Sequence, residues 1–172
     1  PRRRALLSLL VAEFDTADPD IDESLLPDES PVQYVARLAA AKAQACASAD
    51  YAVLGADTTV AIGSEILGKP DNREAARESL RQLSGCTHDV HTALSLQIAG
   101  CAQIRVASTL VTFTQLTEEA IEQYLKMDEF VGKAGAYAIQ GYAGAFVSRI
   151  EGSYSAVVGL PLCETRGLLL AA

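Results

Sequence analysis

The chain has 172 residues, of which 49% are hydrophobic, and its 22 acidic and 14 basic residues give a formal net charge of −8. This length fits one domain with a substantial core, and the excess of acid argues against a broad surface for a nucleic-acid polymer or an anionic membrane. No apolar run approaches the ~18 residues needed to cross a bilayer. The four cysteines form no CxxC pair, so we expect a reducing compartment, the cytoplasm, rather than a disulfide framework.

The first predicted element is a helix over PRRRALLSLL, because Pro1 precedes an apolar run. Arg2, Arg3 and Arg4 occupy its first turn, where the helix dipole favours acidic residues instead. They form either a solvated basic helix end or an anion site, in which guanidinium and backbone N–H groups share phosphate oxygens. The residues alone leave both interpretations open.

A second helix is predicted after the acidic, proline-bearing segment 18–31, whose carboxylates we expect mostly to solvate a loop. Ser30, Pro31 and Gln33 have the pattern of a helix start with a capping box. The helix continues through VQYVARLAAAKAQACA, and its alanine-rich face allows close packing against a sheet.

Residues 51–55 (YAVLG) predict a short strand that ends just before Asp57, and residues 58–67 predict a hairpin that turns at Gly63 and Ser64. A carboxylate at a strand end is well placed for metal binding or general-base chemistry, because the strand fixes it and the loop leaves it open. The alternative is an aspartate that caps a turn.

A third helix is predicted over residues 71–85, with Asp71 and Glu74 as a capping box and Gly85 as its stop. Lys69 lies just before it, between a glycine and a proline. Such a short, constrained loop suits a lysine that faces a ligand. An ordinary surface lysine is the alternative.

Residues 88–116 alternate in two long arms about Ala99 and Gly100, which predicts an antiparallel hairpin. On such a strand His88 and His91 point to opposite faces, so we do not expect them to form a zinc site with Cys86.

The last third of the chain predicts a helix over 117–127, a strand pair within 144–162 and a terminal helix over 161–172. Between them, KAGAYAIQGYAGAF is rich in small residues that let a flat ligand lie against the backbone, and Gln140 offers a donor and an acceptor to a base edge. A tight turn between packed elements is the alternative. Helices and strands together indicate an α/β domain with a mixed sheet.

Eight stretches, in order, resemble the Maf family of nucleoside triphosphate pyrophosphatases: PRRR, DIDES, RLAAAKA, VLGADTTV, ILGKP, LSGCTHDVHTALSL, KAGAYAIQG and GSYSAVVGLPL. The resemblance covers nearly the whole chain. It implies one domain over residues 1–172, with a mixed sheet flanked by helices and two lobes around a central cleft, as in Maf and inosine triphosphatase-like proteins. Compared with the family pattern, the chain is expected to lack the first strand, its serine-containing loop and the end of the last helix.

The activity that this resemblance implies is hydrolysis of a nucleoside triphosphate between its α and β phosphates, with Mg²⁺ or Mn²⁺ as cofactor. The stretches around Gln140 and Ser155 look like the branch that acts on dTTP and UTP, with a house-cleaning role that extends to modified pyrimidine nucleotides. The family also suggests a homodimer. The alternative is a nucleotide-binding regulator of cell division or septum formation with little turnover.

The family's functional positions carry over one by one. Asp57 matches the proton acceptor. The positions linked to substrate choice are Arg2, Thr58 and Gln140. The remaining polar lining of the cleft corresponds to Arg3, Glu23, Lys42 and Lys69. The resemblance thus implies that Arg2, Arg3, Lys42 and Lys69 offset the phosphate charge. Glu23 and Asp57 are the expected metal ligands, and the sequence does not separate the ligand from the base.

Overall fold

A computed structural model describes all of residues 1–172 and contains one five-stranded sheet in the order β2-β1-β3-β4-β5. The strands are β1 Val53–Ile62, β2 Glu65–Leu67, β3 Thr87–Ile98, β4 Cys101–Phe113 and β5 Val147–Glu151. The helices are α1 Arg2–Leu7, α2 Pro31–Ala45, α3 Arg73–Leu83, α4 Glu118–Leu125, α5 Tyr154–Val158 and α6 Leu162–Leu170, with 3₁₀ turns η1 Ala134–Ala136 and η2 Tyr142–Phe146. The predicted α/β class is confirmed.

The sheet is antiparallel throughout rather than mixed, since all four strand pairs run in opposite directions. Parallel neighbours need a crossover connection, usually a helix. Here α2 precedes every strand, and α3 leads from β2 to β3, which pairs with β1 in the opposite direction. The helices therefore flank the sheet without serving as crossovers between parallel strands.

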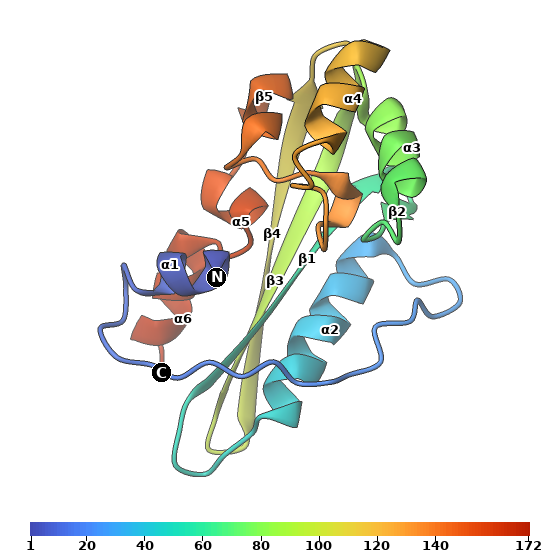
Figure 1. The fold of residues 1–172 in the computed structure, drawn as a ribbon. Helices are drawn as coiled ribbons and strands as arrows, with labels where there is room; N and C mark the ends of the chain where they lie inside the picture. The colour runs from blue at the N-terminus through green and yellow to red at the C-terminus, as the bar shows by residue number, and fades with distance from the viewer.

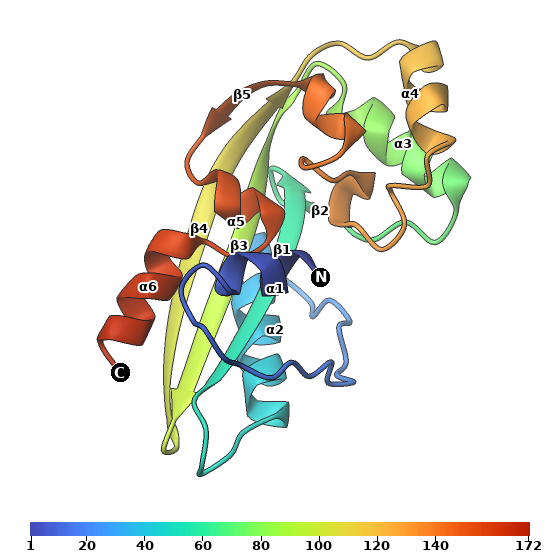
Figure 2. The same cartoon turned by 60° about the vertical axis from the view of Figure 1, so that its left-hand side comes forward.

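Helices cover both faces of the long strands (Figure 1). On one face α2 packs against β1 and β3, and on the other α5 and α6 pack against β3 and β4 with α1 beside α5. Segment 8–30 carries the chain from the α1 side to the α2 side (Figure 2). A second group, made of α3, α4 and the two 3₁₀ turns, gathers at one end of the strands (Figure 2). No helix is both long and apolar enough to cross a membrane.

The largest core cluster lies where this second group meets the sheet, and its aromatic members Phe113, Tyr124, Tyr137 and Phe146 contact one another edge to face. Two smaller clusters lie on the two faces of the long strands. Leu94, Leu96, Leu160 and Leu168 pack on the α6 side. Val35, Ala39 and Ala93 pack on the α2 side.

Local sequence signals placed several boundaries correctly. Ser30 and Gln33 form the predicted capping box of α2. The β3–β4 hairpin turns at Ala99 and Gly100, which have φ of +48° and +81°. These positive values suit the turn that matches strand twist.

Besides the mixed sheet, three further expectations were wrong. The strand predicted over residues 51–55 does not end before Asp57. It is part of β1, which continues to Ile62 and pairs with β3 from Val53 to Ala61. The cap of α3 is Asn72, whose side chain accepts from the Ala75 N–H, so Asp71 lies outside the helix. Residues 154–158 form α5 rather than a strand, because the Ser153 side chain accepts from the Ala156 N–H and caps a helical turn.

Candidate active site

Four of the predicted site residues form one alternating chain of charges, which we call the site charge chain: Asp57, Lys42, Glu23 and Lys69. Lys42 Nζ lies 2.6 Å from Asp57 Oδ1 and 2.6 Å from Glu23 Oε1. Lys69 Nζ lies 2.8 Å from Glu23 Oε2. Four residues from separate parts of the sequence thus meet at one place.

Close packing of α2 on β1 brings Lys42 to Asp57. Asp57 is 7% exposed and lies in the middle of β1, on the face that α2 covers. Gly55 points to the same face two residues earlier, and a Cβ there would lie 2.3 Å from the Ala39 carbonyl oxygen. Glycine at this position therefore allows the helix backbone to approach the strand.

Glu23 and Lys69 reach the same place from loops. The Tyr34 hydroxyl on α2 donates to the Glu23 carbonyl oxygen at 3.0 Å, which ties segment 8–30 to the helix that carries Lys42. Lys69 lies two residues after the end of β2. Helix α2 therefore helps to orient both carboxylate partners of Lys42, since it packs against the strand that carries Asp57 and binds the backbone of Glu23 through Tyr34.

The charges in this chain stabilise one another. Hydrogen bonds from Lys42 and then Lys69 lower the pKa of Glu23 to about 2, although partial burial opposes them. Burial acts to lower the pKa of Lys42, but the hydrogen bonds to Asp57 and Glu23 together outweigh it, and the pKa of Lys42 is raised. Glu23 and Lys42 are therefore both ionised near neutral pH.

A second polar group lies on the opposite face of β1, because side chains alternate along a strand. Arg3 Nη2 donates to Thr58 Oγ1 at 3.2 Å, and Arg3 Nε donates to the Gly159 carbonyl oxygen at 2.8 Å. Thr58 Oγ1 also lies 2.9 Å from Thr92 Oγ1, whose hydroxyl donates to the Ala156 carbonyl oxygen at 2.7 Å.

The two groups meet around the edge of the sheet. β2 pairs only with Val60 to Ile62, so residues 53–59 form an edge of β1. Burial lowers the pKa of Arg3, and the negative charge of Asp57 on the other face acts to raise it. Arg3 is therefore close enough to the site charge chain for the two to interact through space.

Arg2 and Gln140, which the sequence also predicts as site residues, make no side-chain hydrogen bond or ion pair with the site charge chain. Burial lowers the pKa of Lys133, and the positive charge of Arg2 lowers it further. Gln140 is exposed on a turn, and its side chain makes no hydrogen bond within the protein. It is free to bind a ligand.

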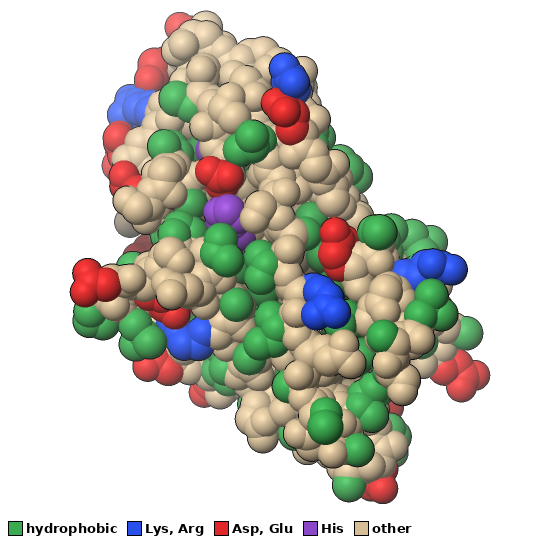
Figure 3. Space-filling model, turned by 180° about the vertical axis from the view of Figure 1, so that it is seen from behind, with side chains coloured by type: hydrophobic (Ala, Val, Ile, Leu, Met, Phe, Trp, Pro, Cys, Tyr) green, Lys and Arg blue, Asp and Glu red, His purple; other side chains and the backbone are tan.

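The candidate site carries more positive than negative charge. Arg2, Arg3 and Lys133 make no ion pair with a carboxylate. Together with Lys42 and Lys69, these five cations exceed the three carboxylates of the same region, Glu23, Asp57 and Glu129, in a chain whose net charge is −8. On the face seen in Figure 3, by contrast, basic side chains are scattered singly. The site therefore provides a local positive field suited to a small polyanion.

The donor set at Glu23 and Asp57 fits a hard divalent cation. Both carboxylates contact the same ammonium group, so their oxygens converge. The chain has no group of three or more His, Cys, Asp or Glu placed to hold a metal. Mg²⁺ is commonly held by only one or two carboxylates, with substrate phosphates as further ligands. Two converging carboxylates beside a polyanion site satisfy that requirement.

The two histidines lie on β3, as their alternation predicts, and have partners elsewhere. His88 Nε2 lies 2.8 Å from the Tyr137 hydroxyl inside the main core. His91 Nδ1 lies 2.8 Å from Ser108 Oγ on β4. His88 thus joins the sheet to the segment that carries Tyr137, whereas His91 joins β3 to β4 within the sheet.

Sequence reasoning missed three contacts of the candidate site. Tyr34 lies eight residues before Lys42 on α2, so helical periodicity could have placed both on one face. Thr92 becomes relevant only through its pairing with Thr58 across two strands. Gly159 follows α5, a helix predicted as a strand, and its carbonyl oxygen accepts from Arg3.

Fold and site together define an α/β protein in which lysines gather around a pair of carboxylates. The Maf family, described as "Maf-like protein", matches residues 1–172. A relative from Hahella chejuensis is 49% identical over 98% of this chain and 87% of its own length, and one from Pseudoalteromonas atlantica is 50% identical over 98% and 91%. A relative from Escherichia coli is 48% identical over 98% and 87%. All three are named "dTTP/UTP pyrophosphatase". This chain belongs to the Maf family.

Proposed function

We propose that this chain is a nucleoside triphosphate pyrophosphatase that hydrolyses dTTP and UTP to the nucleoside monophosphate and pyrophosphate. The observation that carries this proposal is the pair of carboxylates on Lys42, with Lys69 on Glu23 and the unpaired Arg3 on the opposite face of β1. A triphosphate brings about four negative charges near neutral pH, which such an excess of cations offsets. The names of relatives that match 98% of the chain support the same activity.

In the reaction, a water oxygen forms a bond to phosphorus as the bridging P–O bond between the α and β phosphates breaks. The water loses a proton, and pyrophosphate leaves. Asp57 is the proposed proton acceptor, since the strand holds its carboxylate rigidly beside Lys42. Arg3 and Lys69 lie near enough to the two carboxylates to bind phosphate oxygens.

Glu23 and Asp57 would hold Mg²⁺ or Mn²⁺, which would neutralise phosphate charge and favour ionisation of the attacking water. Asp57 and Glu23 share one cation, Lys42, and either side chain suits the ligand role. Lys42 keeps the carboxylates charged and in place before substrate binds.

Gln140 is the proposed reader of the base. Its amide nitrogen donates to O4 of thymine or uracil, and its amide oxygen accepts from N3–H, which matches the one acceptor and one donor on that edge. Arg2, whose charge acts on Lys133, and Thr58, held by Thr92, are the other residues proposed to affect substrate choice.

The test is a nucleotide panel with Mg²⁺ or Mn²⁺ and separate detection of pyrophosphate and orthophosphate. We expect dTTP and UTP to give pyrophosphate, and Asp57→Asn to lose this activity while it keeps the wild-type circular dichroism spectrum. Orthophosphate as the first product would contradict cleavage between the α and β phosphates. Comparable turnover of 7-methyl-GTP and dTTP would contradict the assignment to pyrimidine substrates.

A nucleotide-binding regulator with little turnover is not favoured, since relatives across most of the chain are named as pyrophosphatases. Nucleotide affinity by calorimetry without any product would instead support it. The homodimer and the cytoplasmic location stay predictions, which light scattering and cell fractionation can check.

A further inference from the structure

Gln140 lies on a turn that is held by a backbone hydrogen bond and by the burial of its neighbour Ile139 in the main core. The Gly141 N–H donates to the Ala138 carbonyl oxygen at 3.0 Å, which closes the turn around Ile139 and Gln140. Ile139 is 7% exposed and packs in the main core, whereas Gln140 is exposed. The turn therefore projects the glutamine outward from a rigid base.

A carboxylate from the preceding loop holds the other end of this turn. Glu129 Oε2 accepts from the Tyr142 N–H at 2.9 Å. The same group lies directly against Gly141, where an added Cβ would lie 2.1 Å from Oε2 and 2.6 Å from Cδ. Only a glycine next to Gln140 leaves room for the carboxylate to reach the backbone.

Glu129 is itself well anchored and has no competing role. Its neighbour Phe130 is buried in the main core. The Glu129 carboxylate makes no ion pair, and its one hydrogen bond is the one that it accepts from the Tyr142 N–H. A hydrogen bond from an amide to a carboxylate is shorter and stronger than one to a neutral acceptor.

We propose that Glu129 is a positioning residue for base recognition, which fixes the backbone after Gln140 so that its amide meets the edge of the base. This inference rests on the proposed function. Because Glu129 acts on the part of the site that reads the base, its loss weakens substrate binding and discrimination more than the chemical step. Freeing the turn adds conformational freedom that binding must then remove.

The experiment compares Glu129→Ala, Glu129→Gln and Gly141→Ala with the wild type, using dTTP and dCTP and release of pyrophosphate. We expect Glu129→Ala to raise KM for dTTP about 10-fold, with kcat changed less than about 2-fold, and to reduce the preference for dTTP over dCTP. Glu129→Gln raises KM less than Glu129→Ala does, because its amide oxygen still accepts from Tyr142 although a neutral acceptor is weaker. Gly141→Ala displaces the Glu129 carboxylate from the Tyr142 N–H. It should therefore have the same effect as Glu129→Ala although the carboxylate is still present.

The matched control is Glu119→Ala, since Glu119 is exposed on α4 and makes no hydrogen bond or ion pair through its side chain. It leaves KM and preference unchanged. The inference is overturned if Glu129→Ala keeps the wild-type KM and preference. A Glu129→Gln variant as impaired as Glu129→Ala, with thermal melting unchanged, also overturns it. A wild type that hydrolyses no nucleotide refutes the proposed function instead, and dTTP affinity by calorimetry across the same variants then tests Glu129 on its own.

Discussion

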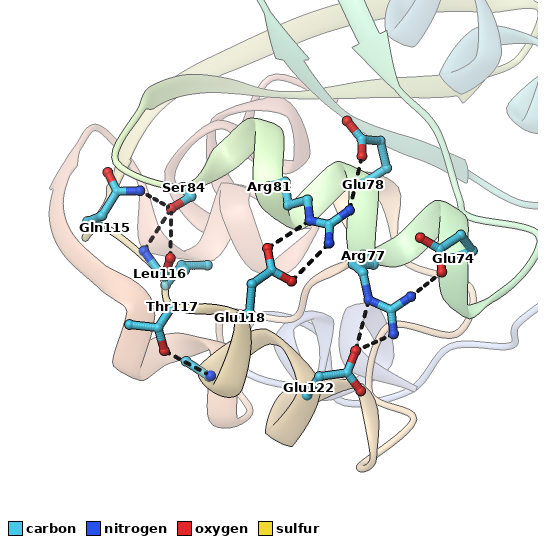
Figure 4. A network of polar contacts seen from close by, with 11 residues as sticks. Glu74, Arg77, Glu78, Arg81, Ser84, Gln115, Leu116, Thr117, Glu118 and Glu122 are labelled. Atoms are coloured by element: carbon cyan, nitrogen blue, oxygen red, sulfur yellow. Dashed lines mark hydrogen bonds and ion pairs between the residues drawn. The ribbon is translucent and has the colours of Figure 1, made fainter.

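Two networks of acids and bases in this molecule look alike in composition and differ in construction. Between α3 and α4, arginines on one helix meet glutamates on the other (Figure 4). Arg81 Nε and Nη2 lie 2.8 and 2.9 Å from the two oxygens of Glu118. Arg77 donates through Nε and Nη2 to one oxygen, Oε1, of Glu122 and also contacts Glu74. The site charge chain uses lysines, which contact carboxylates at single points.

The difference lies in what each network leaves unsatisfied. In the α3–α4 network each guanidinium is matched by a carboxylate, and hydrogen bonds lower the pKa of Glu118 and Glu122. Around the site charge chain, Arg2 and Arg3 have no acidic partner. A network that is complete by itself joins two helices, whereas one with surplus cations is ready to bind an anion. We therefore expect the first to affect stability and the second to affect activity.

The largest effect is expected from Lys42→Met, which breaks the site charge chain at its centre. Two carboxylates then face each other without a shared cation, so the pKa of Glu23 rises from its value of about 2. We expect kcat/KM for dTTP to fall by about 100-fold or more, measured by pyrophosphate release, with the Glu23 titration followed by NMR.

Lys126→Met is the matched control, because Lys126 is exposed at the end of α4 and its side chain makes no ion pair. It should keep wild-type activity. An active Lys42→Met protein would show that the site charge chain is only structural, and the contrast between the two networks would fail.

As the pH falls, a group in the core is expected to titrate before the carboxylates of either network. The pKa of Glu23, Glu118 and Glu122 is lowered, so these carboxylates stay ionised between pH 7 and 5. His88, by contrast, is 1% exposed, and burial lowers its pKa from 6.5 to about 4. Between pH 6.5 and 4 the unfolded state binds a proton at His88 that the folded state does not. The free energy of unfolding is therefore highest above pH 6.5, and it falls by about 3 kcal/mol as the pH drops towards 4.

Urea unfolding at pH 7.5, 6, 5 and 4 measures this loss, and His88→Phe should flatten the profile most. His91→Phe is the comparison, since the pKa of His91 is also lowered by burial while the charge of Asp89 opposes the shift. A profile that His88→Phe leaves unaltered would assign the acid sensitivity to other groups.

The contrast also shows what sequence can reveal. The α3–α4 arginines recur every four residues, and the hairpin at Ala99 and Gly100 shows in its alternation, because such signals are local. The site charge chain depends on three contacts across the fold, so its residues could be named only through the family resemblance. Asp57 was expected at a strand end because it follows the short apolar run that closes with Gly55. That glycine in fact allows α2 to pack on a continuous strand.

Gly55→Ala disturbs the site charge chain without changing a charge. The added methyl group would lie 2.3 Å from the Ala39 carbonyl oxygen and 2.7 Å from the Ala43 nitrogen, so α2 must move away from β1. We expect a loss of about 2 kcal/mol in the free energy of unfolding and a lower kcat, because Lys42 shifts relative to Asp57. Gly167→Ala, on α6 with no atom near the added group, is the control; it should leave activity unchanged and raise the free energy of unfolding by up to about 1 kcal/mol. Equal behaviour of the two variants would mean that the α2 approach does not set the site.

The smallest effect is expected from the α3–α4 network, where Arg77→Met removes a contact to Glu122 on the other helix. The pair is solvent-accessible, so water and salt screen it. We expect the midpoint of thermal unfolding to fall by about 2 °C at low ionic strength and by less in 1 M NaCl, while kcat/KM stays within about 2-fold of wild type. The double variant Arg77→Glu with Glu122→Arg should recover only part of the loss, because Glu74 then faces a like charge on its own helix. A fall in activity beyond about 10-fold would show instead that α3 and α4 control the site, since α3 packs against η1 just before Gln140.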